Sequence, residues 1–120
     1  MTSYMYVVAF NKELEQLVNI VAAKFPDDAG VQQTKMKIEM ANYVSPKAAA
    51  LGFMSYALKY QKEIAQRDEK FFMEKGMQTP ELSHLKLDEK FSAFNQDEKN
   101  EMWAKVTVMN QLGGRIIASS

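Results

Sequence analysis

Hydrophobic residues recur every three or four positions along the first part of the chain. Between Ser3 and Phe25 they fall on one face of a helix, at Val7, Phe10, Leu14, Leu17, Val18, Val21 and Phe25. Polar residues occupy most of the remaining positions, which is the pattern of an amphipathic helix packed on a core. Pro26 disfavours a helical backbone at the residue before it, so this helix should end at Phe25.

A second helix should span about residues 28–43. Asp27 or Asp28 precedes it and offers a carboxylate to the free N–H groups of its first turn. Its core-facing stripe is formed by Val31, Thr34, Ile38 and Ala41. Further apolar positions should widen this stripe, namely Met36, Met40, and Tyr43 or Val44.

The segment SPK, at residues 45–47, predicts the start of a third helix. Ser45 offers a capping oxygen, and Pro46 suits the first helical position, where no N–H is needed. The helix should run through Arg67, and Gly76 should close this region. One stripe along it is formed by Phe53, Ala57, Tyr60, Ile64 and Phe71.

The segment RDEKFF, at residues 67–72, places charged residues directly before two aromatic rings. Neighbouring helical residues point about 100° apart, so Phe71 and Phe72 should not share one stripe. Phe71 continues the core stripe, whereas Phe72 needs cover from the final helix or from another chain. We expect Arg67, Asp68 and Glu69 to fix the helix end by ion pairs and capping.

The last third of the chain contains two helix starts. Asp88 should cap a short helix in EKFSAF, and Asn95 with Glu98 has the spacing of a capping box. The final helix should cover about residues 96–112 and end at Gly113-Gly114. Its buried residues should be Met102, Trp103, Val106, Met109 and Leu112. Residues 1–114 then form one helical domain, and residues 115–120 a short tail.

No segment shows the alternating pattern of a β-strand. We therefore expect an all-α fold, a compact bundle of four main helices plus a short helix with short connections. Such connections favour antiparallel neighbours.

Charge and composition narrow the classes of function. Fifteen Lys and Arg balance fifteen Asp and Glu, so no net field attracts phosphates, and we expect no nucleic-acid partner. No apolar run approaches the roughly 18 residues that cross a bilayer, so no membrane span is expected. We therefore expect a soluble protein. The start of the chain lacks the basic region of a signal peptide, so we expect it to belong to the mature protein.

Catalytic and cofactor motifs are sparse. His84 is the only histidine and the chain has no Cys, which leaves little basis for a metal site or a catalytic triad. The five glycines form no phosphate-binding loop, and the paired acids suit helix starts. We expect no enzymatic activity, metal or cofactor.

Methionines and aromatic residues are numerous. Met36, Met54, Met102 and Met109 should fill the core. An alternative to an interaction protein is a ligand-binding or enzymatic bundle with a pocket between the third and fourth helices. That pocket would be lined by Tyr56, Tyr60 and Trp103, with Glu63 or Asp68 as its acid.

Four motifs carry a resemblance to a known family. They are FP at Phe25-Pro26, SPK at residues 45–47, YQKEIAQRDEKFF from Tyr60, and EKNEMW from Glu98. From about Phe10 to Leu112 the chain resembles small helical proteins encoded by large nucleocytoplasmic DNA viruses of algae and other protists. Ser45 and Lys47 stand where that family more often has Asn and Arg, and the segment GGRIIASS departs from it.

The resemblance implies a viral source rather than a mechanism. It points to a virion component or to an adaptor that binds a viral or host protein, in the virion or the host cytoplasm. We expect a non-enzymatic protein that acts through protein contacts, including contacts with its own copies. The candidate contact residues are Arg67, Asp68, Glu69, Phe72, Met73, Met77, Ile116 and Ile117. The motif residues with a structural role are Phe25, Pro26, Tyr60, Ile64, Phe71 and Trp103.

Overall fold

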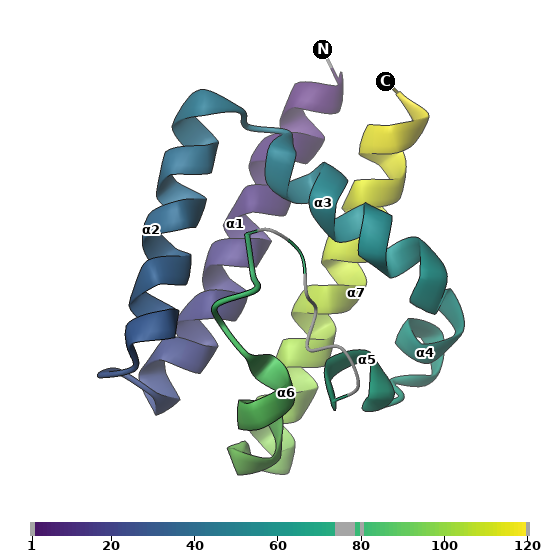
Figure 1. Cartoon of the computed structure of the whole chain (residues 1–120). Helices are drawn as coiled ribbons and strands as arrows, with labels where there is room; N and C mark the ends of the chain where they lie inside the picture. Colours follow the sequence, from purple (N-terminus) through teal and green to yellow (C-terminus); the bar gives the residue numbers. More distant parts are fainter. Residues whose placement is uncertain (1, 74–78, 80, 120) are drawn as a thin grey trace.

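The protein folds into a bundle of helices (Figure 1). The computed structural model describes residues 2–73, 79 and 81–119. Within these ranges the chain forms helices and turns and contains no strand, so the predicted all-α class is confirmed. The expected number of helices, four main and one short, is too low because the middle of the chain is divided into several short helices.

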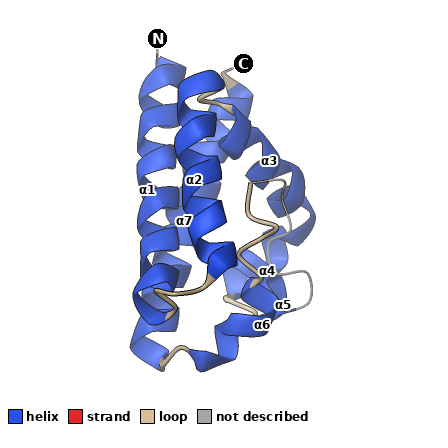
Figure 2. Ribbon diagram, turned by 60° about the vertical axis from the view of Figure 1, so that its left-hand side comes forward, coloured by secondary structure: helices blue, strands red, loops and turns tan. Residues whose placement is uncertain are grey.

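Two long helices form the centre of the bundle. Helix α1 (Thr2–Lys24) and helix α7 (Gln96–Ala118) lie side by side in opposite directions, so both ends of the chain lie at the same end of the bundle (Figure 1). Helix α2 (Ala29–Val44) packs against α1 and runs antiparallel to it (Figure 2). The shared core along α1 contains the buried side chains predicted from its stripe, from Val7 to Val21.

The connections on either side of α2 are short, as expected. Asp28 caps the helix, since its Oδ1 accepts a hydrogen bond of 3.0 Å from the Val31 N–H. Ser45 closes α2 through its own N–H, which donates to the Ala41 carbonyl at 2.8 Å. Helix α3 (Ala48–Ala57) begins at Ala48, two residues after Pro46, where the sequence predicted its start. The predicted cap by the Ser45 side chain is wrong, because no side chain caps this helix.

The expected continuous helix from residue 48 to Arg67 is wrong. After α3 the backbone tightens into a 3₁₀ turn, η1 (Leu58–Tyr60), and continues as α4 (Gln61–Gln66). Arg67 then adopts a left-handed conformation with φ of 51°, which ends the helix and turns the chain into α5 (Lys70–Met73). The hydrophobic period continues across this region, so the sequence pattern contains no sign of the turn.

Two short elements precede the final helix. They are α6 (Leu87–Lys90) and the 3₁₀ turn η2 (Phe91–Ala93). Asp88 lies within α6, whose cap position is held by Lys86 in a left-handed conformation, so the expected Asp88 cap is wrong. The capping box is confirmed: the Glu98 N–H donates to Asn95 Oδ1 at 2.9 Å, and the Asn95 N–H donates to Glu98 Oε1 at 2.8 Å.

Helix α7 continues through Gly113-Gly114 to Ala118, so the expected tail from residue 115 is wrong. Gly113 is buried against α3, and a Cβ placed there would collide with the sulfur of Met54. Glycine at this position therefore lets two helices approach closely rather than ending one of them. Ile116 is fully buried as a consequence of the continued helix.

Candidate functional site

The two rings of RDEKFF both point into the core. Phe71 and Phe72 have no exposed surface. The final helix covers Phe72 through Trp103, as one of the two alternatives predicted, so Phe72 is not available as a contact residue. The Phe72 ring stacks on Phe91 with centroids 4.5 Å apart and meets Trp103 edge-on at 4.8 Å. Because α5 is a separate short helix that contacts both α4 and α6, both of its rings can be buried.

The charged residues before these rings act on local structure. Asp68 Oδ1 accepts the Lys70 N–H at 3.0 Å, which caps the start of α5. Glu69 lies 3.5 Å from the Lys99 ammonium on α7. The Arg67 side chain is exposed, and its backbone has a left-handed conformation. These three residues therefore stabilise the turn between α4 and α5.

Of the other predicted contact residues, two are exposed. Met73 and Ile117 each have 40% of their surface accessible, whereas Ile116 is buried and is not available as a contact. Met77 lies outside the described residues.

The remaining motif residues have packing roles. Phe25 meets Phe94 edge-on with centroids 5.9 Å apart, and the Pro26 carbonyl accepts a hydrogen bond from Gln32. Ile64 is buried, and Tyr60 packs partly buried against the core.

The expected pocket beside Tyr60 and Trp103 is filled by side chains. Tyr56 and Tyr60 stack with centroids 4.8 Å apart, and Phe71 lies 5.3 Å from Tyr56 and 5.9 Å from Trp103. The Tyr56 hydroxyl donates to the Phe71 carbonyl at 2.7 Å. These rings occupy the space that a ligand at this position would need.

An apolar stripe covers the outer face of α2. Met36, Met40 and Tyr43 are 62%, 65% and 92% exposed, and Val44 beside them is also exposed. The prediction that Met36 fills the core is wrong, as is the expected widening of the buried stripe by Met40 and Tyr43. Residues two positions apart on a helix point about 200° apart, so Met36 and Met40 face away from the buried Ile38.

This stripe was missed although the sequence contains its signal. Met36, Met40 and Tyr43 follow the spacing of i, i+4 and i+7, which places them on one helix face of their own. The chain thus has two apolar faces on α2, one covered by α1 and α3 and the other uncovered within the described structure.

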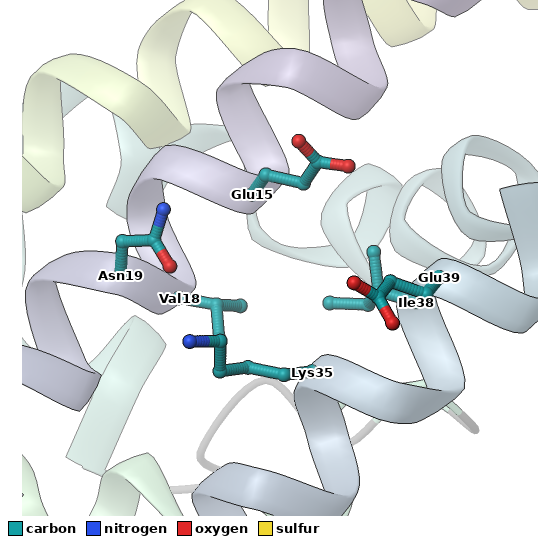
Figure 3. A pocket seen from close by; sticks show the side chains of 6 residues that line it. All are labelled: Glu15, Val18, Asn19, Lys35, Ile38 and Glu39. Atoms are coloured by element: carbon teal, nitrogen blue, oxygen red, sulfur yellow. The ribbon is translucent and has the colours of Figure 1, made fainter. Parts of the chain in front are cut away.

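A groove runs beside this stripe between α1 and α2. One part is a cavity of about 170 Å³, into which Glu15 and Asn19 of α1 and Lys35 and Glu39 of α2 project (Figure 3). Val18 and Ile38 also line this part.

A second part of the groove extends toward the start of α1. This cavity of about 310 Å³ shares Glu15 and is also lined by Tyr4, Val7, Val8, Asn11, Lys12, Asn42 and Pro46. Asn11 donates to the Pro46 carbonyl at 3.0 Å and Asn42 donates to Glu15 at 3.2 Å. The side-chain oxygens of both asparagines are almost inaccessible and have no hydrogen-bond partner among the described residues.

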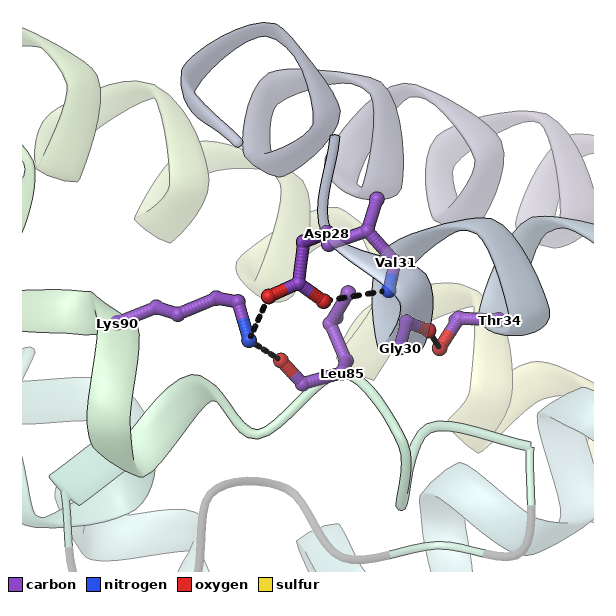
Figure 4. A network of polar contacts seen from close by, with 6 residues as sticks. All are labelled: Asp28, Gly30, Val31, Thr34, Leu85 and Lys90. Carbon is purple, nitrogen blue, oxygen red and sulfur yellow. Dashed lines mark hydrogen bonds and ion pairs between the residues drawn. The ribbon is translucent and has the colours of Figure 1, made fainter. Parts of the chain in front are cut away.

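The opposite end of α2 is held by a polar network. The Lys90 ammonium lies 3.3 Å from Asp28 Oδ2 and donates to the Leu85 carbonyl at 2.9 Å (Figure 4). The hydrogen bond from the Val31 N–H, assisted by Lys90, holds the pKa of Asp28 below its ordinary value. His84 is exposed beside this network, as expected for a surface histidine. The network therefore fixes the loop before α6 on the start of α2.

No cluster of three His, Asp or Glu side chains able to hold a metal ion occurs among residues 2–73, 79 and 81–119. Within the same described part, no helix has both the length and the apolar character needed to cross a membrane.

In comparisons with known proteins, no family model, no curated protein and no solved structure matches this chain.

Proposed function

We propose that this protein is a non-enzymatic interaction protein that binds another protein through the outer face of α2. The observation that carries this proposal is the exposed stripe of Met36, Met40 and Tyr43 on α2, opposite the buried face of that helix. Methionine adapts to irregular partner surfaces, and tyrosine is enriched where proteins meet.

The spacing of the stripe indicates the shape of the partner. Apolar side chains at i, i+4 and i+7 match those of a second amphipathic helix that lies along α2. Lys37 and Glu39 beside the stripe are exposed and supply the polar rim of such an interface. The partner helix belongs either to a different protein or to a second copy of this chain.

The resemblance to proteins of large DNA viruses adds a biological setting to this proposal. In that setting the chain serves as a virion-associated component or as an adaptor during infection, in the virion or the host cytoplasm. The alternative, a ligand-binding or enzymatic bundle, loses support because aromatic rings fill the space beside Tyr60 and Trp103.

The test replaces Met36 and Met40 by serine in one chain. Both side chains are largely exposed, so the variant should fold normally while its affinity for the partner falls about tenfold or more. The measurement is quantitative mass spectrometry of co-purified proteins from infected cells, together with light scattering to detect self-association.

Leu58→Ser is the matched control because Leu58 is 60% exposed but lies on η1, away from α2. It should retain the partner. Unchanged partner recovery and unchanged oligomeric state in the Met36 and Met40 variant would refute the proposal.

A further inference from the structure

Exposed apolar side chains gather at one end of the bundle. Here α1 begins, α2 and α7 end, and the chain enters α3 (Figures 1 and 2). Tyr4, Met5, Val8 and Val44 each expose more than half of their surface, and Ile117 exposes 40%. We refer to these five residues as the apolar end.

Specific contacts hold the segments of the apolar end together. The Arg115 guanidinium on α7 donates to the Tyr6 hydroxyl at 3.3 Å and lies 5.5 Å from the centre of its ring. Asn11 of α1 donates to the Pro46 carbonyl between α2 and α3 at 3.0 Å. The apolar side chains are therefore presented by a folded surface built from several segments.

The charged side chains of the segments that form this end are all positive. Residues 1–12, 40–52 and 108–120 contain Lys12, Lys47 and Arg115 and no Asp or Glu. All fifteen acidic residues lie in residues 13–39 and 53–107, so these three segments contain no acid of their own. The Glu81 carboxylate approaches them at Gly52, in the middle of α3.

The nearest carboxylates on the groove side lie further along the helices. Glu15 is bound to the Asn42 amide and shares its cavity with Lys12. Glu39 lies on α2 about one turn before Tyr43, in the cavity that also contains Lys35. Lys12 lines the same cavity as Glu15, whereas Lys47 and Arg115 follow or precede exposed apolar residues in segments that contain no acid.

We propose that the apolar end docks onto the surface of an anionic lipid bilayer. Apolar side chains that enter the boundary between headgroups and acyl chains, with Lys and Arg directed at lipid phosphates, form the usual combination for binding at the interface. Tyr4 adds an aromatic side chain with a polar tip, which suits the headgroup level.

The apolar composition favours a bilayer over other anionic partners. A nucleic acid offers phosphates but no apolar medium for Met5, Val8, Val44 and Ile117. A bilayer accepts side chains from several segments without a matching partner shape. This docking is separate from the proposed protein contact, which uses Met36 and Met40 on the side of α2.

The first experiment is co-sedimentation of the full chain with vesicles. We expect binding to vesicles of phosphatidylcholine mixed with phosphatidylserine, weaker binding to phosphatidylcholine alone, and a decrease as NaCl is raised. Failure to sediment with either composition overturns the proposal, as does equal binding to both.

Two variants test whether vesicle binding depends on this end of the bundle. Met5→Ser combined with Val44→Ser should lower the partition coefficient about tenfold, because two apolar side chains no longer enter the bilayer. Lys47→Glu should weaken binding several-fold on the anionic vesicles only, and a Glu beside the start of α3 is compatible with that helix.

The matched controls are Leu58→Ser and Met36→Ser, which replace exposed apolar residues outside these three segments. Both should bind vesicles as the unaltered chain does, with circular dichroism confirming the fold of each protein. If the controls lose vesicle binding while the Met5 and Val44 variant retains it, the apolar end is not the docking surface.

Discussion

At the scale of single residues, the Phe72 ring is enclosed on two sides. It stacks on Phe91 with an interplanar angle of 18° and meets Trp103 at 62°. Met73, the next residue, is 40% exposed. One step along the backbone therefore separates a core position from a surface position.

Phe72→Ala should lower the free energy of unfolding by about 3–5 kcal/mol, because it removes a buried ring and leaves a cavity. Met73→Ala should cost less than about 1 kcal/mol, since its side chain is partly in water. Urea unfolding measured by circular dichroism compares the two. Equal losses of stability in the two variants would show that Phe72 is not packed as described. Because Phe72 is buried, a Phe72 variant that binds a protein partner less tightly could do so through loss of its fold.

At the scale of helices, the contact between α3 and α7 depends on one of two adjacent glycines. Gly113 faces Met54, which is buried and has little room to move, whereas a Cβ at Gly114 would meet no atom within 4 Å. Both lie in the interior of α7. The two glycines therefore have the same helical backbone conformation but differ in the free space beside each Cα.

Gly113→Ala should destabilise the protein by about 1–3 kcal/mol, because the new methyl group overpacks the α3 contact. Gly114→Ala should stabilise it by about 0.5–1 kcal/mol, because alanine is the better helix former and meets no obstacle. Thermal and urea unfolding measure both changes. Opposite signs are expected, and a stabilising Gly113→Ala would contradict the close approach.

Acid should weaken the caps of α2 and α7. The hydrogen bond from the Asn95 N–H holds the pKa of Glu98 below its ordinary value, and the Lys24 ammonium, 3.0 Å from Glu98 Oε1, adds to this effect. The hydrogen bond from the Val31 N–H lowers the pKa of Asp28 in the same way. A carboxyl group whose pKa is lower in the folded chain stabilises the fold above its unfolded pKa, and this contribution is lost as pH falls through the folded pKa. Stability should therefore decline as pH drops below about 4.5.

The measurement is urea unfolding at a series of acidic pH values, for the unaltered chain and for Glu98→Gln. Glu98→Gln should show a shallower decline, because glutamine has no proton to gain. Glu101→Gln, an exposed position in the same helix, is the control and should follow the unaltered chain. An identical decline in all three proteins would remove Glu98 from the acid response.

The helices that sequence predicted well have local start signals. The capping box at Asn95 and the cap at Asp28 both precede long amphipathic stretches, and the structure contains both. The break at Arg67 has no such signal, because a left-handed conformation at a non-glycine residue depends on tertiary contacts. The end predicted at Gly113-Gly114 failed for the opposite reason, since glycine also serves close packing.

At the scale of the whole molecule, sequence reasoning gave the class of fold but misplaced its surfaces. The prediction that methionines fill the core is confirmed for Met54, Met102 and Met109. Met36 and Met40 lie on the far side of the same helix as Ile38. Only the packing of α2 against α1 and α3 decides which of its two apolar faces is covered.

The apolar end depends even more on the fold. Its residues come from the start of α1 and the ends of α2 and α7, which are far apart in sequence. Each segment alone contains a few apolar residues and no acids, which is unremarkable in a chain with no net charge. Their combined character emerges only when the topology brings them to one end (Figure 1).

The enclosure of Trp103 gives the protein an internal optical reporter. It is the only tryptophan in the chain, is 3% exposed, and lies where rings from α5, η2 and α7 meet. Its fluorescence should arise from a single dry environment and shift to longer wavelengths when water reaches the indole. One emission spectrum, without an attached dye, therefore follows the opening and closing of the aromatic core in every variant described above.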